Sequence, residues 1–209
     1  MDLDTLADRF GARHAEPVNV GCSGATVVRL ERATETLYYK AGSDVADEAD
    51  RVAWLGATGF GCPPLLDRGN DWMLTTALPG RDASQPWPAA ERPAVLRAVA
   101  ECLRQLHSLT DCPFDSPFPG SRVVVTHGDY CMPNILVDPE TMRFTGVLDL
   151  GRLGLGDPYV DVALMTMSLS SSELNPQYGG PPAARSFALD YGADPDDDRI
   201  PLYISLDNF

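Results

Sequence analysis

The stretch HGDYCMPN at residues 127–134, followed by LDLGR at residues 148–152, decides the fold and the chemistry that this chain can carry. Asp129, Asn134 and Asp149 place three oxygen-bearing side chains on two neighbouring loops. Phosphoryl transfer needs one carboxylate to orient the acceptor hydroxyl, and a carboxylate and an amide oxygen to hold Mg²⁺ against the nucleotide. The pattern therefore predicts Asp129 as the catalytic residue, and Asn134 and Asp149 as metal ligands.

Turn formation is the alternative explanation, because Asp and Asn side chains hydrogen-bond to nearby backbone in turns. It would account for either half of the pattern alone, but it does not predict that the two halves occur together. Protein kinases combine a catalytic-loop Asp and Asn with a separate metal-binding Asp in the same order. We therefore favour a kinase-type site at these positions.

A second pair of residues lies upstream, where Lys40 ends a predicted strand and Glu48 lies on the apolar stripe of the next predicted helix. A carboxylate that faces the core needs a partner, because burying it alone is costly. The two side chains are predicted to form an ion pair that presents the lysine to the phosphates of ATP, as in the kinase N-lobe. An ordinary surface carboxylate at the helix edge is the alternative.

The rest of the chain reads as strands first and helices later, which predicts an α+β fold. Short β-branched and aromatic runs predict strands at 25–30, 37–41, 72–77, 123–125, 135–137 and 144–148, and 3.6-residue periodicity predicts helices at 44–58, 89–109 and 161–170 with two more near the C-terminus. Residues 78–80, Leu-Pro-Gly, predict a hinge between two lobes. The segment 170–182 gives no clear prediction.

Charge and cysteine content narrow the class of protein. The formal net charge of −14 disfavours nucleic acid as a partner and suits a polycationic small molecule, although the acid also serves solubility. The five cysteines form no CxxC pair, which predicts reduced thiols in the cytoplasm and no zinc site. The acidic, amphipathic N-terminus is not typical of a signal peptide, and no run is long enough for a membrane span.

Beyond these patterns, the sequence resembles the aminoglycoside 3′-phosphotransferases, the kanamycin and neomycin kinases of the protein-kinase-like superfamily. The matching stretches run from about Val20 to Phe209 and include GCSGATVVRL, DEADRVAWL, LHSLTDCPFD, VVVTHGDYCMPNILVD, FTGVLDLGRLGLGDPYVDVAL and LYISLDNF. The resemblance implies a bilobal fold with an antiparallel-sheet N-lobe at residues 1–77 and a mainly helical C-lobe at residues 78–209. It also implies antibiotic resistance through ATP- and Mg²⁺-dependent phosphorylation of a 3′-hydroxyl.

Nucleotide-binding residues follow from the same resemblance. Ser23, in the small-residue loop GCSGA, would lie over the γ-phosphate, and Lys40 would hold the phosphates with Glu48 behind it. The backbone around Thr76 and Leu78 would bind adenine. The small-residue loop alone is weak evidence, since a plain hairpin turn explains it about as well.

Acceptor-binding residues are implied in the second half of the chain. Asp129 would face the acceptor hydroxyl, Arg152 and Asp157 would flank the site, and Asp207 and Phe209 would bind the substrate from the C-terminus. Two further residues match the family: Asp161 would brace the catalytic loop, and His107 would serve packing.

The sequence departs from the family in two places. Only a short Pro-rich linker joins Asp115 to His127, where the family has a helical segment that forms one wall of the antibiotic site. Either this segment is deleted, or the printed chain omits a mobile stretch. The ending Asp207-Asn208-Phe209 replaces the usual Asp-Glu-Phe-Phe and removes one carboxylate.

These departures leave two alternative functions. The first is a kinase of the same fold that acts on another small alcohol, and the second is a nucleotide-binding module that has lost catalysis. The presence of Asp129, Asn134 and Asp149 disfavours the second. The oligomeric state does not follow from the sequence.

Overall fold

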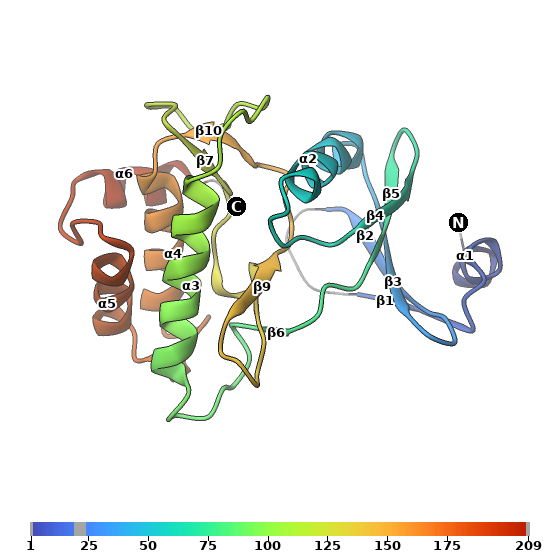
Figure 1. The fold of residues 1–209 in the computed structure, drawn as a ribbon, viewed down its shortest axis with the longest axis horizontal. Helices are drawn as coiled ribbons and strands as arrows, with labels where there is room; N and C mark the ends of the chain where they lie inside the picture. Colours follow the sequence, from blue (N-terminus) through green and yellow to red (C-terminus); the bar gives the residue numbers. More distant parts are fainter. Residues whose placement is uncertain (1, 19–23, 208–209) are drawn as a thin grey trace. The chain divides into compact units, whose positions relative to one another are not determined.

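The computed structural model describes residues 2–18 and 24–207, and the chain divides into two compact units, Met1–Leu78 and Pro79–Phe209 (Figure 1). The first unit holds an antiparallel sheet with two helices, and the second is mainly helical. The predicted α+β fold is therefore confirmed. The division follows Leu78, within the Leu-Pro-Gly segment that predicted a hinge.

The sheet of the first unit has five antiparallel strands in the order β1-β2-β3-β5-β4. Their bounds are β1 His14–Pro17, β2 Thr26–Glu31, β3 Thr36–Ala41, β4 Leu65–Arg68 and β5 Trp72–Thr76. The predicted strands at 25–30, 37–41 and 72–77 correspond to β2, β3 and β5. The outer strands β1 and β4 were not predicted, because each is only four residues long and carries charged or proline residues.

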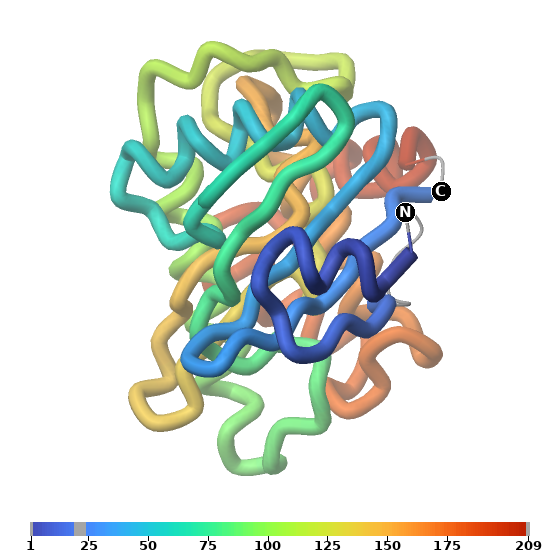
Figure 2. Tube along the Cα trace, turned by 90° about the vertical axis from the view of Figure 1, so that its right-hand side faces the viewer, coloured from blue at the N-terminus to red at the C-terminus, as the bar shows by residue number. Residues whose placement is uncertain are grey.

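Two helices, α1 (Leu3–Phe10) and α2 (Val45–Ala57), pack on this sheet. Leu6 and Phe10 of α1 join Leu37 and Tyr39 of β3 in one apolar core, and Figure 2 shows α1 in dark blue lying across the strands. Side chains alternate between the two faces of a strand, so Lys40 points away from this core. Its partner Glu48 is on α2, which covers that other face.

The second unit is built around four helices: α3 (Arg92–His107), α4 (Tyr159–Ser170), α5 (Pro181–Tyr191) and α6 (Arg199–Leu206). A small sheet of β6 (Arg81–Asp82), β8 (Ile135–Val137) and β9 (Phe144–Val147) packs against α3. A separate pair joins β7 (Val124–Thr126) to β10 (Gly154–Gly156). Two 3₁₀ turns complete the unit, η1 (Met132–Asn134) in the catalytic loop and η2 (Pro176–Tyr178) in the segment that the sequence left unassigned.

The apolar stripe that predicted α3 is buried, since Val95, Val99, Leu103 and Leu106 are all inaccessible to solvent. Helix α4 is apolar on nearly every side and runs through the centre of this unit. It packs against both α5 and α6. None of the helices in the described part of the chain has the length and hydropathy needed to cross a membrane.

Candidate active site

The catalytic loop lies between β7 and β8, and β9 leads directly to the second part of the motif. Strands β8 and β9 are antiparallel with Ile135 opposite Val147, and the Leu148 N–H donates to the Asn134 carbonyl at 2.8 Å. This register brings Asn134 beside the residue that precedes Asp149. The structure therefore brings the two halves of the motif together, as the spacing predicted.

Asp161, on α4, braces the catalytic loop. Its carboxylate is completely buried and accepts hydrogen bonds from the backbone N–H groups of His127 at 2.7 Å and Gly128 at 2.8 Å. His107 Nε2 lies 2.9 Å from the same carboxylate, and His107 Nδ1 lies 2.8 Å from the Tyr191 hydroxyl. The predicted bracing by Asp161 is confirmed. His107 does more than fill space, because it connects the Asp161 carboxylate to the Tyr191 hydroxyl.

His127 joins the two loops of the site. Its Nε2 lies 2.8 Å from the Leu148 carbonyl, which can only accept, and its Nδ1 lies 3.2 Å from the Asp129 N–H, which can only donate. These partners select the tautomer that carries its proton on Nε2. The imidazole thereby fixes the backbone of Asp129 relative to the residue before Asp149.

The carboxylate of Asp129 is partly buried and lies near the charge of a second carboxylate, Asp149. Burial raises its pKa above the ordinary value of an aspartate, and the nearby charge of Asp149 raises it further. Asn134 Nδ2 donates to Asp129 Oδ2 at 3.0 Å and to the Asp129 carbonyl at 2.9 Å. A carboxylate with a raised pKa next to a second carboxylate is typical of a group that handles a proton.

The residues present fit a magnesium ion of the kinase type. Because Nδ2 of Asn134 is engaged with Asp129, its Oδ1 is directed away from that carboxylate, and the charge of Asp149 is close enough to act on Asp129. Mg²⁺ uses one or two protein oxygens and completes its shell with water and phosphate oxygens. Asp149 has a φ of 58°, in the left-handed region that only Gly, Asn and Asp adopt readily. Such conformations are enriched at functional sites.

Gly128 permits the close approach of the two loops. Its φ is 80°, and a Cβ added there would lie 2.6 Å from the backbone oxygen of Arg152. At Gly192 the φ is 103°, but an added Cβ would meet nothing within 4 Å. The two glycines therefore share the backbone requirement and differ in the space around them.

We expect Gly128→Ala to lower the free energy of unfolding by about 2–4 kcal/mol, the sum of backbone strain and overpacking. Gly192→Ala should cost only about 1–2 kcal/mol, since it carries the backbone strain alone. Urea unfolding followed by circular dichroism measures both. Equal losses in the two variants would show that the contact with Arg152 relaxes without cost.

Arg152 connects the catalytic loop with the C-terminal end of α6. Its Nη1 donates to the Gly128 carbonyl at 3.3 Å and to Asp207 Oδ1 at 2.9 Å, and its guanidinium lies over the ring of Phe118 at 5.6 Å. The structure thus brings the predicted residues Arg152 and Asp207 together, with Arg152 bound to the residue that precedes Asp129. Phe209 lies outside the described residues.

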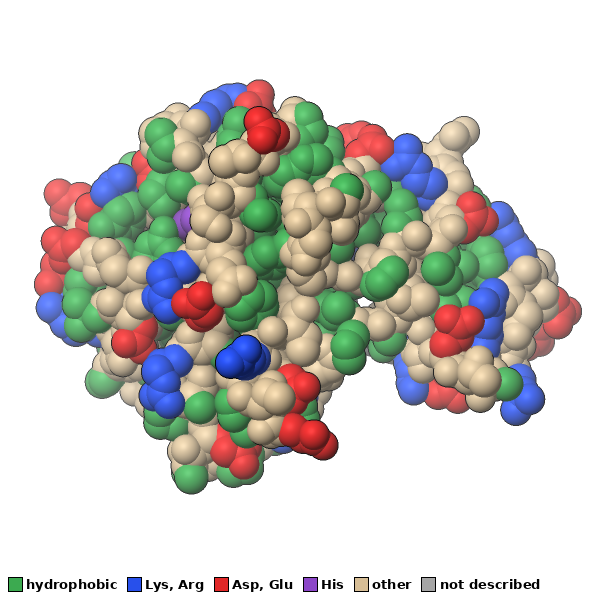
Figure 3. All heavy atoms as spheres, viewed as in Figure 1, with side chains coloured by type: hydrophobic (Ala, Val, Ile, Leu, Met, Phe, Trp, Pro, Cys, Tyr) green, Lys and Arg blue, Asp and Glu red, His purple; other side chains and the backbone are tan. Residues whose placement is uncertain are grey.

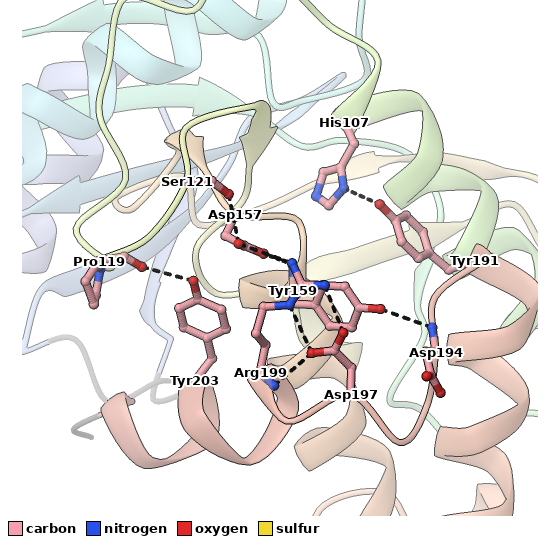
Figure 4. Close-up of polar contacts among 10 residues, drawn as sticks. All are labelled: His107, Pro119, Ser121, Asp157, Tyr159, Tyr191, Asp194, Asp197, Arg199 and Tyr203. Carbon is pink, nitrogen blue, oxygen red and sulfur yellow. Dashed lines mark hydrogen bonds and ion pairs between the residues drawn. The ribbon is translucent and has the colours of Figure 1, made fainter.

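Asp157 is held by several hydrogen-bond donors of the second unit. It is buried, and its carboxylate accepts hydrogen bonds from the Ser121 hydroxyl at 2.8 Å and the Tyr159 N–H at 2.9 Å (Figure 4). Arg199 of α6 also approaches it at 3.4 Å and places its guanidinium 3.7 Å from the centre of the Tyr159 ring. These contacts favour Asp157 as an anchor for α6 over a direct substrate contact.

Arg199 and Tyr203 are two residues that the sequence did not single out. Arg199 pairs with Asp197 at 2.8 Å as well as with Asp157, and the Tyr203 hydroxyl donates to the Pro119 carbonyl at 3.0 Å (Figure 4). Together with Ser121 they fasten the short linker to α6. Their four-residue spacing on an amphipathic helix was a readable signal, but their partners are distant in sequence.

In the first unit the predicted ion pair between Lys40 and Glu48 is confirmed. The Lys40 Nζ lies 2.7 Å from Glu48 Oε2, and the side chains are only 13% and 7% exposed. Thr76 ends β5, where its N–H donates to the Pro64 carbonyl at 3.1 Å, and Leu78 is the last residue of the unit. Ser23 lies outside the described residues.

Removing the carboxylate of this pair should destabilise the fold, because Lys40 loses a close ionic partner in a largely buried setting. We expect Glu48→Gln to lower the free energy of unfolding by about 3 kcal/mol. Glu16→Gln is the matched control, since the Glu16–Arg29 pair of the same sheet is 43% and 37% exposed and solvent screening should make its contribution small. Urea unfolding followed by tryptophan fluorescence tests the difference, and similar losses would contradict it.

Comparison with known proteins places the chain among phosphotransferases. The profile of the phosphotransferase enzyme family matches residues 18–120 and 115–199. The aminoglycoside 3′-phosphotransferase of Streptomyces fradiae is 34% identical over 269 aligned positions that cover 100% of each chain. The crystal structure of an aminoglycoside 3′-phosphotransferase of type VIII has a TM-score of 0.83 and 30% identity, with 98% of each chain covered. An aminoglycoside phosphotransferase of Streptomyces rimosus, solved with ADP and streptomycin, has a TM-score of 0.76 and 27% identity, with 99% and 98% covered.

The comparisons also bear on the short linker between Asp115 and His127, where the sequence departs from the family. The alignment to the Streptomyces fradiae protein spans 269 positions, whereas the chain has 209 residues. The two family matches overlap at residues 115–120, inside the Pro-rich linker. The relative therefore has positions with no counterpart in this chain, and the family match consists of two parts that meet in the linker.

Proposed function

Because the chain belongs to the phosphotransferase enzyme family, we propose that this enzyme transfers the γ-phosphoryl group of ATP, with Mg²⁺, to the 3′-hydroxyl of an aminoglycoside and so confers antibiotic resistance. The observation that carries the proposal is the meeting of Asp129, Asn134 and Asp149 on two loops that a buried carboxylate and an imidazole hold together. Relatives that are 34% and 35% identical are aminoglycoside 3′-phosphotransferases, which supports this acceptor.

Each residue has a distinct task in the proposed reaction. Asp129 accepts a hydrogen bond from the acceptor hydroxyl, orients its oxygen toward phosphorus and receives its proton as the new bond forms. Asn134 and Asp149 would hold Mg²⁺, which neutralises phosphate charge when bound. Lys40, oriented by Glu48, would bind the nucleotide phosphates. Ser23 and the backbone at Thr76 and Leu78 stay predicted nucleotide contacts.

At the acceptor side, Asp207 is the proposed contact for a substrate ammonium group, with Arg152 fixing its carboxylate. Phe209 remains a predicted contact, and we now assign Asp157 to holding α6. Acidic and basic side chains are interspersed over the face that Figure 3 shows, and no single acidic patch dominates it.

Product analysis tests the proposal. Purified protein is incubated with ATP, MgCl₂ and kanamycin, and we expect one phosphate to be added, with the 3′ position established by NMR of the product. An aminoglycoside that lacks the 3′-hydroxyl is the matched control and should remain unmodified.

Two outcomes would overturn the proposal in different ways. Phosphorylation of the 3′-deoxy compound, or of a neutral alcohol in preference to kanamycin, would favour another acceptor for the same fold. ATP binding without transfer to any acceptor would favour a module that has lost catalysis.

A further inference from the structure

Cys131 lies in the catalytic loop between the two residues that the proposed reaction needs most. Its Sγ lies 3.6 Å from Asp129 Oδ1, and Asn134 Nδ2 lies 3.3 Å from the same sulfur. A thiol has one weak S–H donor and a weakly accepting sulfur. Cys131 can therefore donate to the carboxylate, while its sulfur shares an N–H of the amide, whose two hydrogens also face the Asp129 carbonyl and Oδ2.

The loop backbone puts the sulfur in this position. Cys131 is extended, with φ −132° and ψ 162°, and directly precedes the η1 turn that ends at Asn134. The Asn134 N–H donates to the Cys131 carbonyl at 3.0 Å, which folds Asn134 back over Cys131. On α4, the Ser168 hydroxyl accepts from the Met132 N–H at 3.3 Å and fixes the turn.

The two oxygens of Asp129 are consequently held by different neighbours. Oδ1 faces the Cys131 thiol, and Oδ2 accepts from Asn134 Nδ2 at 3.0 Å. Rotation of the carboxylate would break at least one of these contacts. Rotation of the Asn134 amide would replace its N–H donors by an oxygen that faces Asp129, which is unfavourable.

We propose that Cys131 is a positioning residue that sets the orientation of both Asp129 and Asn134 for phosphoryl transfer. The expected effect on kcat rests on the proposed function. The contacts of Cys131 with Asp129 and Asn134 do not depend on that function. A misplacement of about 1 Å at a reacting group can cost about a hundredfold in rate. A partial loosening of the carboxylate should therefore lower kcat and leave the binding of both substrates nearly unchanged.

Three variants test the proposal. Cys131→Ala removes both contacts, and we expect kcat to fall roughly tenfold with the KM values for ATP and kanamycin within about twofold. Cys131→Ser keeps a donor and an acceptor, but an O–H···O bond is roughly 0.8 Å shorter than the 3.6 Å contact, so kcat should recover only in part. Cys112→Ala is the control, because this buried thiol of the same unit lies 3.8 Å from the Phe114 carbonyl and should affect only stability.

The readouts separate positioning from packing and from the proposed function itself. Tm is recorded for each variant. If Cys131→Ala and Cys112→Ala lose kcat in the same proportion to their loss of Tm, the effect of Cys131 is packing alone. Unchanged kcat in Cys131→Ala would also overturn the proposal. If the wild type phosphorylates no aminoglycoside, the proposed function fails. The ¹⁵N resonance of the Asn134 side-chain amide then tests whether Cys131 contacts Asn134. It should shift in Cys131→Ala and not in Cys112→Ala, and an unshifted resonance would refute the contact.

Discussion

Asp129→Asn should lower kcat for kanamycin phosphorylation by about two to four orders of magnitude, the usual contribution of one acid–base group. Asn keeps the shape of the side chain and its contact with Asn134 Nδ2, but it cannot take the proton of the acceptor hydroxyl. The KM for ATP should change little. Asp190→Asn, at an exposed position on α5, is the control and should leave kcat unchanged. A kcat within threefold of wild type for Asp129→Asn would remove Asp129 from the mechanism.

The pKa of Asp129 adds a pH dependence to this prediction. Burial raises this pKa above its value in the unfolded chain, so the native state binds the proton more tightly than the unfolded state. Native stability is therefore favoured below the unfolded pKa and is lost as pH rises through the raised pKa. Asp129→Asn removes this penalty, so its Tm should exceed that of wild type at pH 7 and approach it as pH falls below the raised pKa. A difference in Tm between Asp129→Asn and wild type that grows as pH falls would contradict this prediction.

The second large effect is expected at Asp149. Asp149→Asn should lower kcat by about a hundredfold to a thousandfold, because a metal ion contributes several kcal/mol to the stabilisation of transition-state charge. Calorimetry of ADP binding with and without MgCl₂ measures the metal role directly. Wild type should bind ADP more tightly with Mg²⁺, and the variant should lose most of that difference.

Asp111 offers the matched control for this experiment. Its φ is 62°, close to the 58° of Asp149, but it lies in an exposed loop. Asn adopts the left-handed region about as readily as Asp, so both Asn variants should keep the stability of wild type. An undiminished Mg²⁺ effect in Asp149→Asn would count against Asp149 as a ligand.

Local pattern predicted much of the fold. The helix α2 and the strand β3 follow from periodicity, and their order along the chain was enough to predict the Lys40–Glu48 pair. The strands around the catalytic loop were also predicted, since each is a short run of β-branched or aromatic residues between turns. The helix α1 was missed as an element, although Asp2 caps its first turn and Gly11 ends it in the left-handed conformation. Both signals were local and readable.

Long-range contacts account for the rest. The strand β10 pairs with β7 across 28 residues, and two of its three residues are glycines, which have low strand propensity. The place of Asp157 likewise depends on Arg199, 42 residues away. The family resemblance implied that Asp157 flanks the acceptor, but only the packing of α6 against α4 shows that its carboxylate already has several donors.

The left-handed backbone at Asp149 also affects how easily mutation of the gene could remove and restore enzyme activity. Aspartate codons are one base from asparagine codons and one base from glycine codons, and both of these residues tolerate the 58° φ at that position. With Asp149 as the proposed metal ligand, a single transition to asparagine or glycine would remove the ligand and leave a backbone conformation that the new residue tolerates. The reverse base change would restore the enzyme in one step, without any compensating mutation elsewhere in the gene.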